Sequence, residues 1–157
     1  MHSSVYRSTY AWAIAALFIG LSAAPAGGAQ LYTVFDSALT TGATKYYPLS
    51  VHDLLTDATP GQATEAKAQV PVPVGFLVNM GCTLGAAPGG TANWTFTLRR
   101  NGAATSLTFL ILNPSLKNAI QPATPVALAA GDVVALEVIP AGTPAATNVR
   151  CTLLFRK

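Results

Sequence analysis

The segment NWTFTLRRNGAATSLTFLIL, residues 93–112, decides the fold because it carries the pattern of a β-hairpin. Hydrophobic side chains alternate with polar ones on both sides of Asn101-Gly102, and this alternation predicts two half-buried strands at residues 93–99 and 104–112. An Asn-Gly pair favours a two-residue type I′ turn, because both residues tolerate a positive φ. The segment therefore predicts two adjacent antiparallel strands.

A period of two recurs along most of the chain, and no helical pattern of useful length accompanies it. Glycine (13) and proline (11) separate the apolar runs, as turn residues do between short strands. Further strands are predicted at residues 31–35, 44–49, 63–70, 76–84, 125–130, 132–139 and 148–155. Eight to ten short strands at regular spacing are typical of an all-β antiparallel sandwich or barrel. With 51% hydrophobic residues, the sequence predicts one domain with a sizeable core.

The N-terminus has the organisation of a signal peptide over residues 1–29. Arg7 supplies the positive charge, residues 11–24 are apolar, and small residues precede a candidate cleavage point after Ala29. The apolar run is shorter than the roughly 20 residues of a membrane span. We therefore expect an exported domain of residues 30–157, secreted or held at the cell surface, extracellular or periplasmic, with no stable membrane span after cleavage. An uncleaved N-terminal anchor is the alternative.

The order of features resembles a known superfamily. Short leading strands precede a long strand in PVGFLVNMGCTL, a polar-tipped hairpin follows, and the chain ends in CTLLFRK. The closest local match is a turn and strand in which Gly131 and Asp132 precede alternating Val134, Leu136 and Val138. Residues 31–157 resemble the trimeric jelly rolls of the C1q and tumour-necrosis-factor superfamily, and bacterial spore-surface and phage-fibre tip domains look similar. The resemblance implies a β-sandwich of jelly-roll type and homotrimerisation.

The resemblance also bears on the two cysteines of the chain, Cys82 and Cys151. In that superfamily the strand that corresponds to residues 76–84 is expected to lie near the C-terminal strand. Both cysteines fall on these strands and on their apolar faces, so a disulfide between them is implied for an exported protein. The alternative is a pair of buried free thiols that pack as small hydrophobes.

Few residues could carry chemistry. His2 leaves with the leader, so His52 stands alone, and two cysteines on core faces do not make a zinc site. Asp53 and Asp57 could form a cation site or an acid–base pair, or could lie in a solvated turn. We expect no catalytic residue, no metal and no cofactor.

Two further acids have structural expectations. Asp132 is predicted to be a turn residue whose side chain accepts a hydrogen bond from nearby backbone, and Glu137 to point to solvent or to a neighbouring subunit. The formal net charge of +3 is too small and too scattered to indicate a nucleic-acid partner.

The candidate binding residues are Arg99 and Arg100 beside the hairpin turn and Tyr46 and Tyr47 on an early strand. The arginines are either a contact site or the solvated tip of the hairpin. The tyrosines either stack on sugars and contact other subunits, or are ordinary core and rim residues. The sequence thus predicts a secreted, non-enzymatic structural or binding module, a homotrimeric component of a surface, an appendage or a virion. The alternative is a lectin-like carbohydrate-binding module, whose partner would be a glycan or a surface receptor. A small hydrolase is the third class considered.

Overall fold

Ten strands and one short 3₁₀ helix, η1, make up the described residues, 29–49 and 61–157, of the computed structural model, which places side chains from Leu39 onward. The predicted signal segment falls almost wholly outside these residues. The elements are β1 (Ala29–Leu39), β2 (Lys45–Tyr47), η1 (Glu65–Lys67), β3 (Val70–Pro71), β4 (Gly75–Leu84), β5 (Asn93–Arg100), β6 (Ala103–Leu112), β7 (Lys117–Ile120), β8 (Val126–Leu128), β9 (Val133–Ala141) and β10 (Thr147–Arg156).

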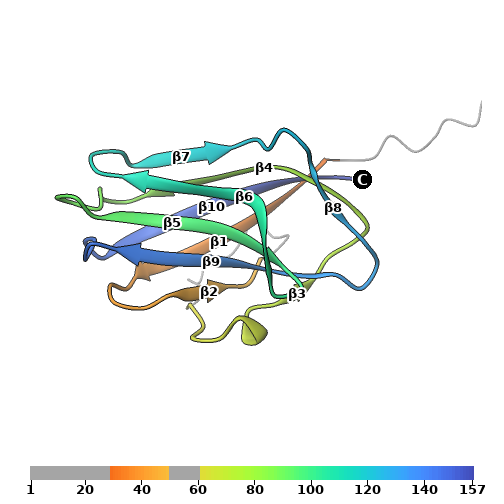
Figure 1. The fold of residues 1–157 in the computed structure, drawn as a ribbon, viewed down its shortest axis with the longest axis horizontal. Coiled ribbons are helices and arrows are strands. Elements are labelled where there is room, and N and C mark those ends of the chain that lie inside the picture. The colour runs from red at the N-terminus through yellow and green to blue at the C-terminus, as the bar shows by residue number, and fades with distance from the viewer. Residues whose placement is uncertain (1–28, 50–60) are drawn as a thin grey trace, which may run out of the picture.

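The strands form two antiparallel sheets of five strands each. Sheet 1 has the order β1-β10-β4-β7, with β8 also paired to β4, and sheet 2 has the order β2-β9-β5-β6, with β3 also paired to β9. Figure 1 shows sheet 2 in front of sheet 1. Along the chain, successive strands change sheet six times, which wraps the chain around the core as in a jelly roll. The predicted fold class, an all-β antiparallel sandwich of jelly-roll type, is confirmed.

The hairpin that opens the sequence argument is present as β5 and β6. Asn101 and Gly102 have φ values of 51° and 82°, the left-handed conformation that the predicted turn requires. The predicted core face is buried, and two of its rings, Phe96 and Phe109, stack with centroids 5.5 Å apart. The face consists of Trp94, Phe96, Leu98, Leu107, Phe109 and Ile111. Alternation alone therefore predicts which face of each strand packs against sheet 1.

The two cysteines form the predicted disulfide. Cys82 in β4 and Cys151 in β10 are direct partners in the register of sheet 1, and a disulfide joins them across 69 residues of chain. Both face the core, with at most 2% of either residue exposed. The bond crosslinks β4 to the last strand, β10.

Two expectations about the strands are wrong. Residues 63–70 do not form a strand, because the carbonyl of Glu65 accepts hydrogen bonds from the backbone N–H groups of Ala68 and Gln69 and bends the chain into η1. The strand β7 was not predicted, because its four residues carry no alternating pattern. Among the residues that the structure describes, no helix has the length and apolar character needed to cross a membrane.

Candidate functional site

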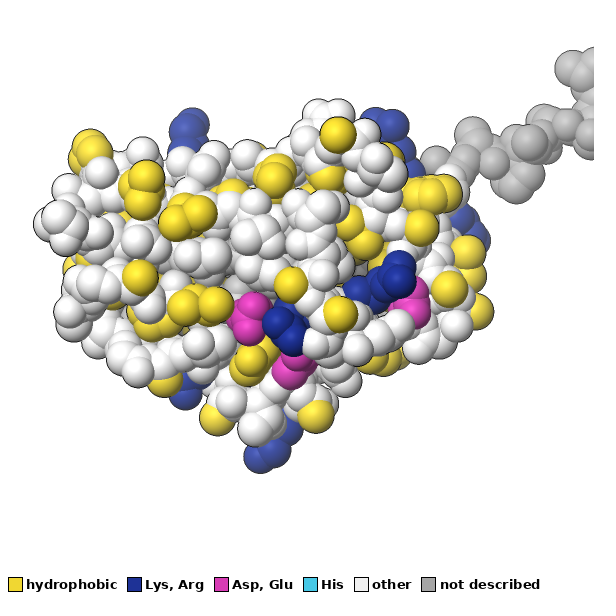
Figure 2. Space-filling model, in the orientation of Figure 1, with side chains coloured by type: hydrophobic (Ala, Val, Ile, Leu, Met, Phe, Trp, Pro, Cys, Tyr) yellow, Lys and Arg dark blue, Asp and Glu magenta, His cyan; other side chains and the backbone are white. Residues whose placement is uncertain are grey.

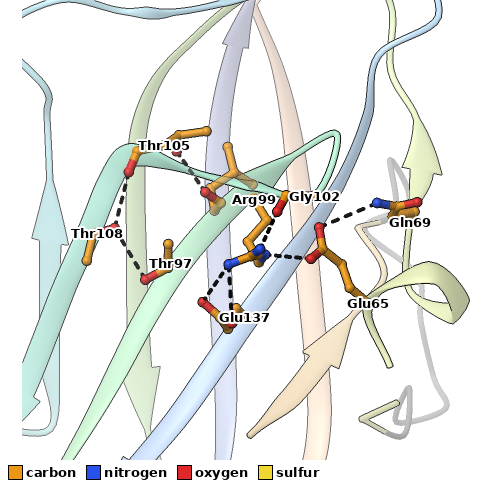
Figure 3. A network of polar contacts seen from close by, with 9 residues as sticks. Glu65, Gln69, Thr97, Arg99, Gly102, Thr105, Thr108 and Glu137 are labelled. Atoms are coloured by element: carbon orange, nitrogen blue, oxygen red, sulfur yellow. Dashed lines mark hydrogen bonds and ion pairs between the residues drawn. The ribbon is translucent and has the colours of Figure 1, made fainter. Parts of the chain in front are cut away.

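Arg99 lies on the outer face of sheet 2 and contacts two carboxylates there. Its Nε donates to Oε2 of Glu65 in η1 at 2.6 Å, and its Nη1 lies 3.4 Å from both carboxylate oxygens of Glu137 in β9. Nη2 donates to the carbonyl of Gly102 at the hairpin turn (Figure 3). Three separate parts of the chain are thus held together by one guanidinium, so Arg99 acts as a clamp within the fold.

The Arg99 cluster is largely shielded from water. The side chains of Arg99, Glu65 and Glu137 are 20%, 15% and 11% exposed. Burial by itself would lower the pKa of Arg99, but the hydrogen bond with Glu65 and the charge of Glu137 outweigh it and raise the pKa above its usual value. The expectation that Glu137 points to solvent or to another subunit is wrong, because it is buried and paired with Arg99.

Arg100 belongs to a second polar cluster, at the end of the hairpin. Its Nη1 donates to the carbonyl of Ala127, and its Nε lies 3.7 Å from Oδ2 of Asp132. Asp132 also accepts hydrogen bonds from the backbone N–H of Ala129 at 2.8 Å and from the side-chain amide of Asn101 at 2.5 Å. The predicted role of Asp132 as a turn residue bonded to nearby backbone is confirmed. These hydrogen bonds, with that of Ala129 the strongest, hold the pKa of Asp132 below its usual value.

The two tyrosines of β2 lie on opposite faces of sheet 2. Tyr47 is in the core with 1% of its surface exposed, and its ring lies so close to Gly61 that a Cβ there would come within 2.7 Å of it. A surface ligand cannot reach Tyr47, which takes the core position considered as its alternative. Tyr46 is half-buried on the outer face, where burial, followed by the charge and hydrogen bond of Glu137, raises the pKa of its phenol. Tyr46 therefore joins the Arg99 cluster and adds a neutral hydrogen-bond donor to it.

The outer face of sheet 2 also carries three exposed apolar side chains. Thr95 in β5 pairs with Leu110 of β6 on one side and with Ile139 of β9 on the other, and Leu112 follows in the next outward row. Leu110, Leu112 and Ile139 are 44%, 54% and 36% exposed. We call these three residues the apolar patch. Figure 2 shows this face, with acidic and basic side chains touching in two places and hydrophobic side chains scattered over the remainder.

His52, Asp53 and Asp57 fall outside the residues that the structure describes, so their predicted alternatives stay open. Within the described ranges, no three His, Cys, Asp or Glu side chains gather as a metal site would require. The sequence matches no protein-family model and no curated protein. The structural partners that sequence reasoning missed are Glu65 and Ala127, which lie far from the arginines in the chain and carry no recognisable motif.

Proposed function

We propose that the protein is an exported, non-enzymatic structural or binding module that assembles as a homotrimer, a component of a surface, an appendage or a virion. The observation that carries this proposal is the distribution of charged and apolar side chains on the outer face of sheet 2. Arg99 is paired with Glu65 and Glu137 inside the subunit, whereas the apolar patch is exposed. Exposed apolar side chains on a sheet face can be covered by a second subunit. The resemblance to the trimeric jelly rolls of the C1q and tumour-necrosis-factor superfamily supports three copies.

The disulfide supports both export and the absence of catalysis. Disulfides persist in oxidising compartments, and a cysteine in a disulfide is no nucleophile. Intact-mass measurement of the exported chain tests the export part of the proposal. We expect a chain that begins at Gln30 and lacks two hydrogens. A chain that keeps residues 1–29, or that has two alkylatable thiols, contradicts it.

The trimer is tested by light scattering on the exported chain and on two charged variants. Leu112→Lys places a charge in the apolar patch and is expected to shift the mass from three copies to one. Val74→Lys is the matched control, because Val74 is equally exposed, at 55%, but lies outside the patch. A trimer that survives Leu112→Lys and dissociates with Val74→Lys contradicts the placement of the contact.

A carbohydrate-binding module is the second candidate function. One observation favours it, a hollow on the outer face of sheet 1 that is lined by hydroxyl and cationic side chains. A glycan array separates this candidate from a purely structural module, because a scaffold is expected to retain none of the glycans. The four residues chosen from the sequence, Tyr46, Tyr47, Arg99 and Arg100, are not its lining, so substituting the hollow is the more informative variant.

A further inference from the structure

The tip of the β5–β6 hairpin carries the one Asn-Gly pair of the sequence, Asn101-Gly102. Asparagine is among the chemically labile residues of proteins. A following glycine makes its deamidation easiest, because glycine has no side chain to hinder attack by its own backbone nitrogen. Both residues are exposed to water. The local sequence and the place in the fold therefore favour spontaneous deamidation at Asn101.

In the folded protein, Asn101 is held by the turn that precedes β9. Its Nδ2 donates to Oδ1 of Asp132 at 2.5 Å, and its Oδ1 accepts from the backbone N–H of Val133 at 2.9 Å. The backbone N–H of Asn101 donates to the carbonyl of Val133 at 2.9 Å. We call these three hydrogen bonds the tip contact. Both polar atoms of the side-chain amide are engaged in it, one of them with a carboxylate, and hydrogen bonds to charged groups are the stronger ones.

Deamidation requires this amide to leave its partners. The backbone nitrogen of Gly102 attacks Cγ of Asn101, so that a new C–N bond forms and the Cγ–Nδ2 bond breaks. Nδ2 departs as ammonia with the proton that the Gly102 nitrogen loses, and a succinimide ring remains. Water then opens one of the two imide carbonyls, which gives aspartate or isoaspartate. The reaction is a hydrolysis without electron transfer, and Nδ2 has to give up Asp132 before it departs.

We propose that Asn101-Gly102 is a deamidation site that the tip contact protects, and that the modification permanently releases the hairpin tip. Aspartate in place of Asn101 would set a second carboxylate against that of Asp132, and like charges at this distance repel. Among the described residues only Arg100 forms an ion pair with Asp132, so the second carboxylate would have no cation of its own. Isoaspartate would lengthen the backbone of a turn whose two residues have φ values of 51° and 82°. The proposal goes beyond the structural or binding function and is independent of the assembly.

Peptide mapping by mass spectrometry tests the proposal on the exported chain, incubated at neutral pH and sampled over time. Asp132→Ala removes the acceptor of Nδ2, and we expect deamidation at Asn101 to become about tenfold faster, because a hydrogen bond to a charged group is lost. Asn118, which is exposed in β7 and followed by Ala119, is the internal control, and its rate should not change. The wild type needs no substitution for a second comparison: its rate at Asn101 should be at least about tenfold lower when folded than in fully unfolding urea.

Low urea concentrations separate release of the tip from unfolding of the whole domain. Below the unfolding transition, the wild-type rate at Asn101 should change by less than about twofold, because release of the tip exposes little surface, whereas a rate set by global unfolding rises steeply with urea. Such a steep rise would overturn the proposal. An unchanged or slower reaction in Asp132→Ala, or equal rates in the folded and the unfolded wild type, would overturn it as well.

Discussion

Replacing Arg99 by methionine is expected to destabilise the protein, although the arginine comes from a sequence that looks like the solvated tip of a hairpin. Methionine keeps the apolar stem of the side chain and removes the guanidinium. The change leaves the carboxylates of Glu65 and Glu137 without their cation, in a place where their side chains are only 15% and 11% exposed.

The magnitude follows from that degree of burial. Removing one partner of a fully buried ion pair costs roughly 3–5 kcal/mol, whereas an exposed pair contributes less than about 1 kcal/mol. The Arg99 cluster lies between these limits, so we expect a loss of about 2 kcal/mol in the free energy of unfolding. Glu137→Gln in the Arg99→Met background should recover part of it, because it removes one of the uncompensated charges.

Urea unfolding of the exported chain measures this loss. With a denaturant slope typical of a domain of this size, about 2 kcal/mol corresponds to a midpoint lowered by about 1 M urea. Arg156→Met is the matched control, since Arg156 is exposed at the end of β10, and its midpoint should stay unchanged. If Arg99→Met and Arg156→Met have the same midpoint, Arg99 is not a clamp and the binding hypothesis for the hairpin tip regains its basis.

Two further predictions concern the disulfide and the loss of stability at acid pH. Replacing both Cys82 and Cys151 by alanine should lower the free energy of unfolding by about 4 kcal/mol, because the disulfide restricts the chain entropy of the unfolded state over a separation of 69 residues. A loss below about 1 kcal/mol in the same urea assay contradicts this prediction. The folded-state pKa of Asp132 lies below its ordinary value of 3.8, so its contribution to stability is complete above pH 3.8 and is lost as the pH falls through the lower folded-state pKa. Thermal melts of the wild type and of Asp132→Asn should therefore differ near neutral pH and converge in acid; a constant difference speaks against the hydrogen bonds of Asp132.

Most of the fold could be predicted from the sequence because it rests on local alternation. In β6 and β10 every second side chain is buried against the other sheet, and the apolar residues of β5 and β9 recur with the same period, which can be read from the residues themselves. The Asn101-Gly102 turn is equally local, since it depends on which residues tolerate a positive φ. The short strand β7 is defined by its pairing with β4, and its own four residues carry no alternating pattern.

The site could not be predicted in the same way, because its contacts join distant parts of the chain. Arg99 meets Glu65 and Glu137, which are 34 and 38 residues away, only after β9 pairs with β5 and η1 folds over sheet 2. Nothing local distinguishes these acids from solvated ones. Gly81 did carry a signal, since a glycine inside a predicted strand suggests a close approach to the backbone. The hollow beside Gly81 is lined by residues of β4, β7 and β10, so it emerges from the sheet order alone.

The assembly is the central claim of the proposed function, and sedimentation equilibrium of the exported chain measures it most directly. The apolar patch and the resemblance to trimeric jelly rolls predict a mass of three chains that persists on dilution into the low micromolar range. A mass of one chain at every concentration would contradict the proposed homotrimer.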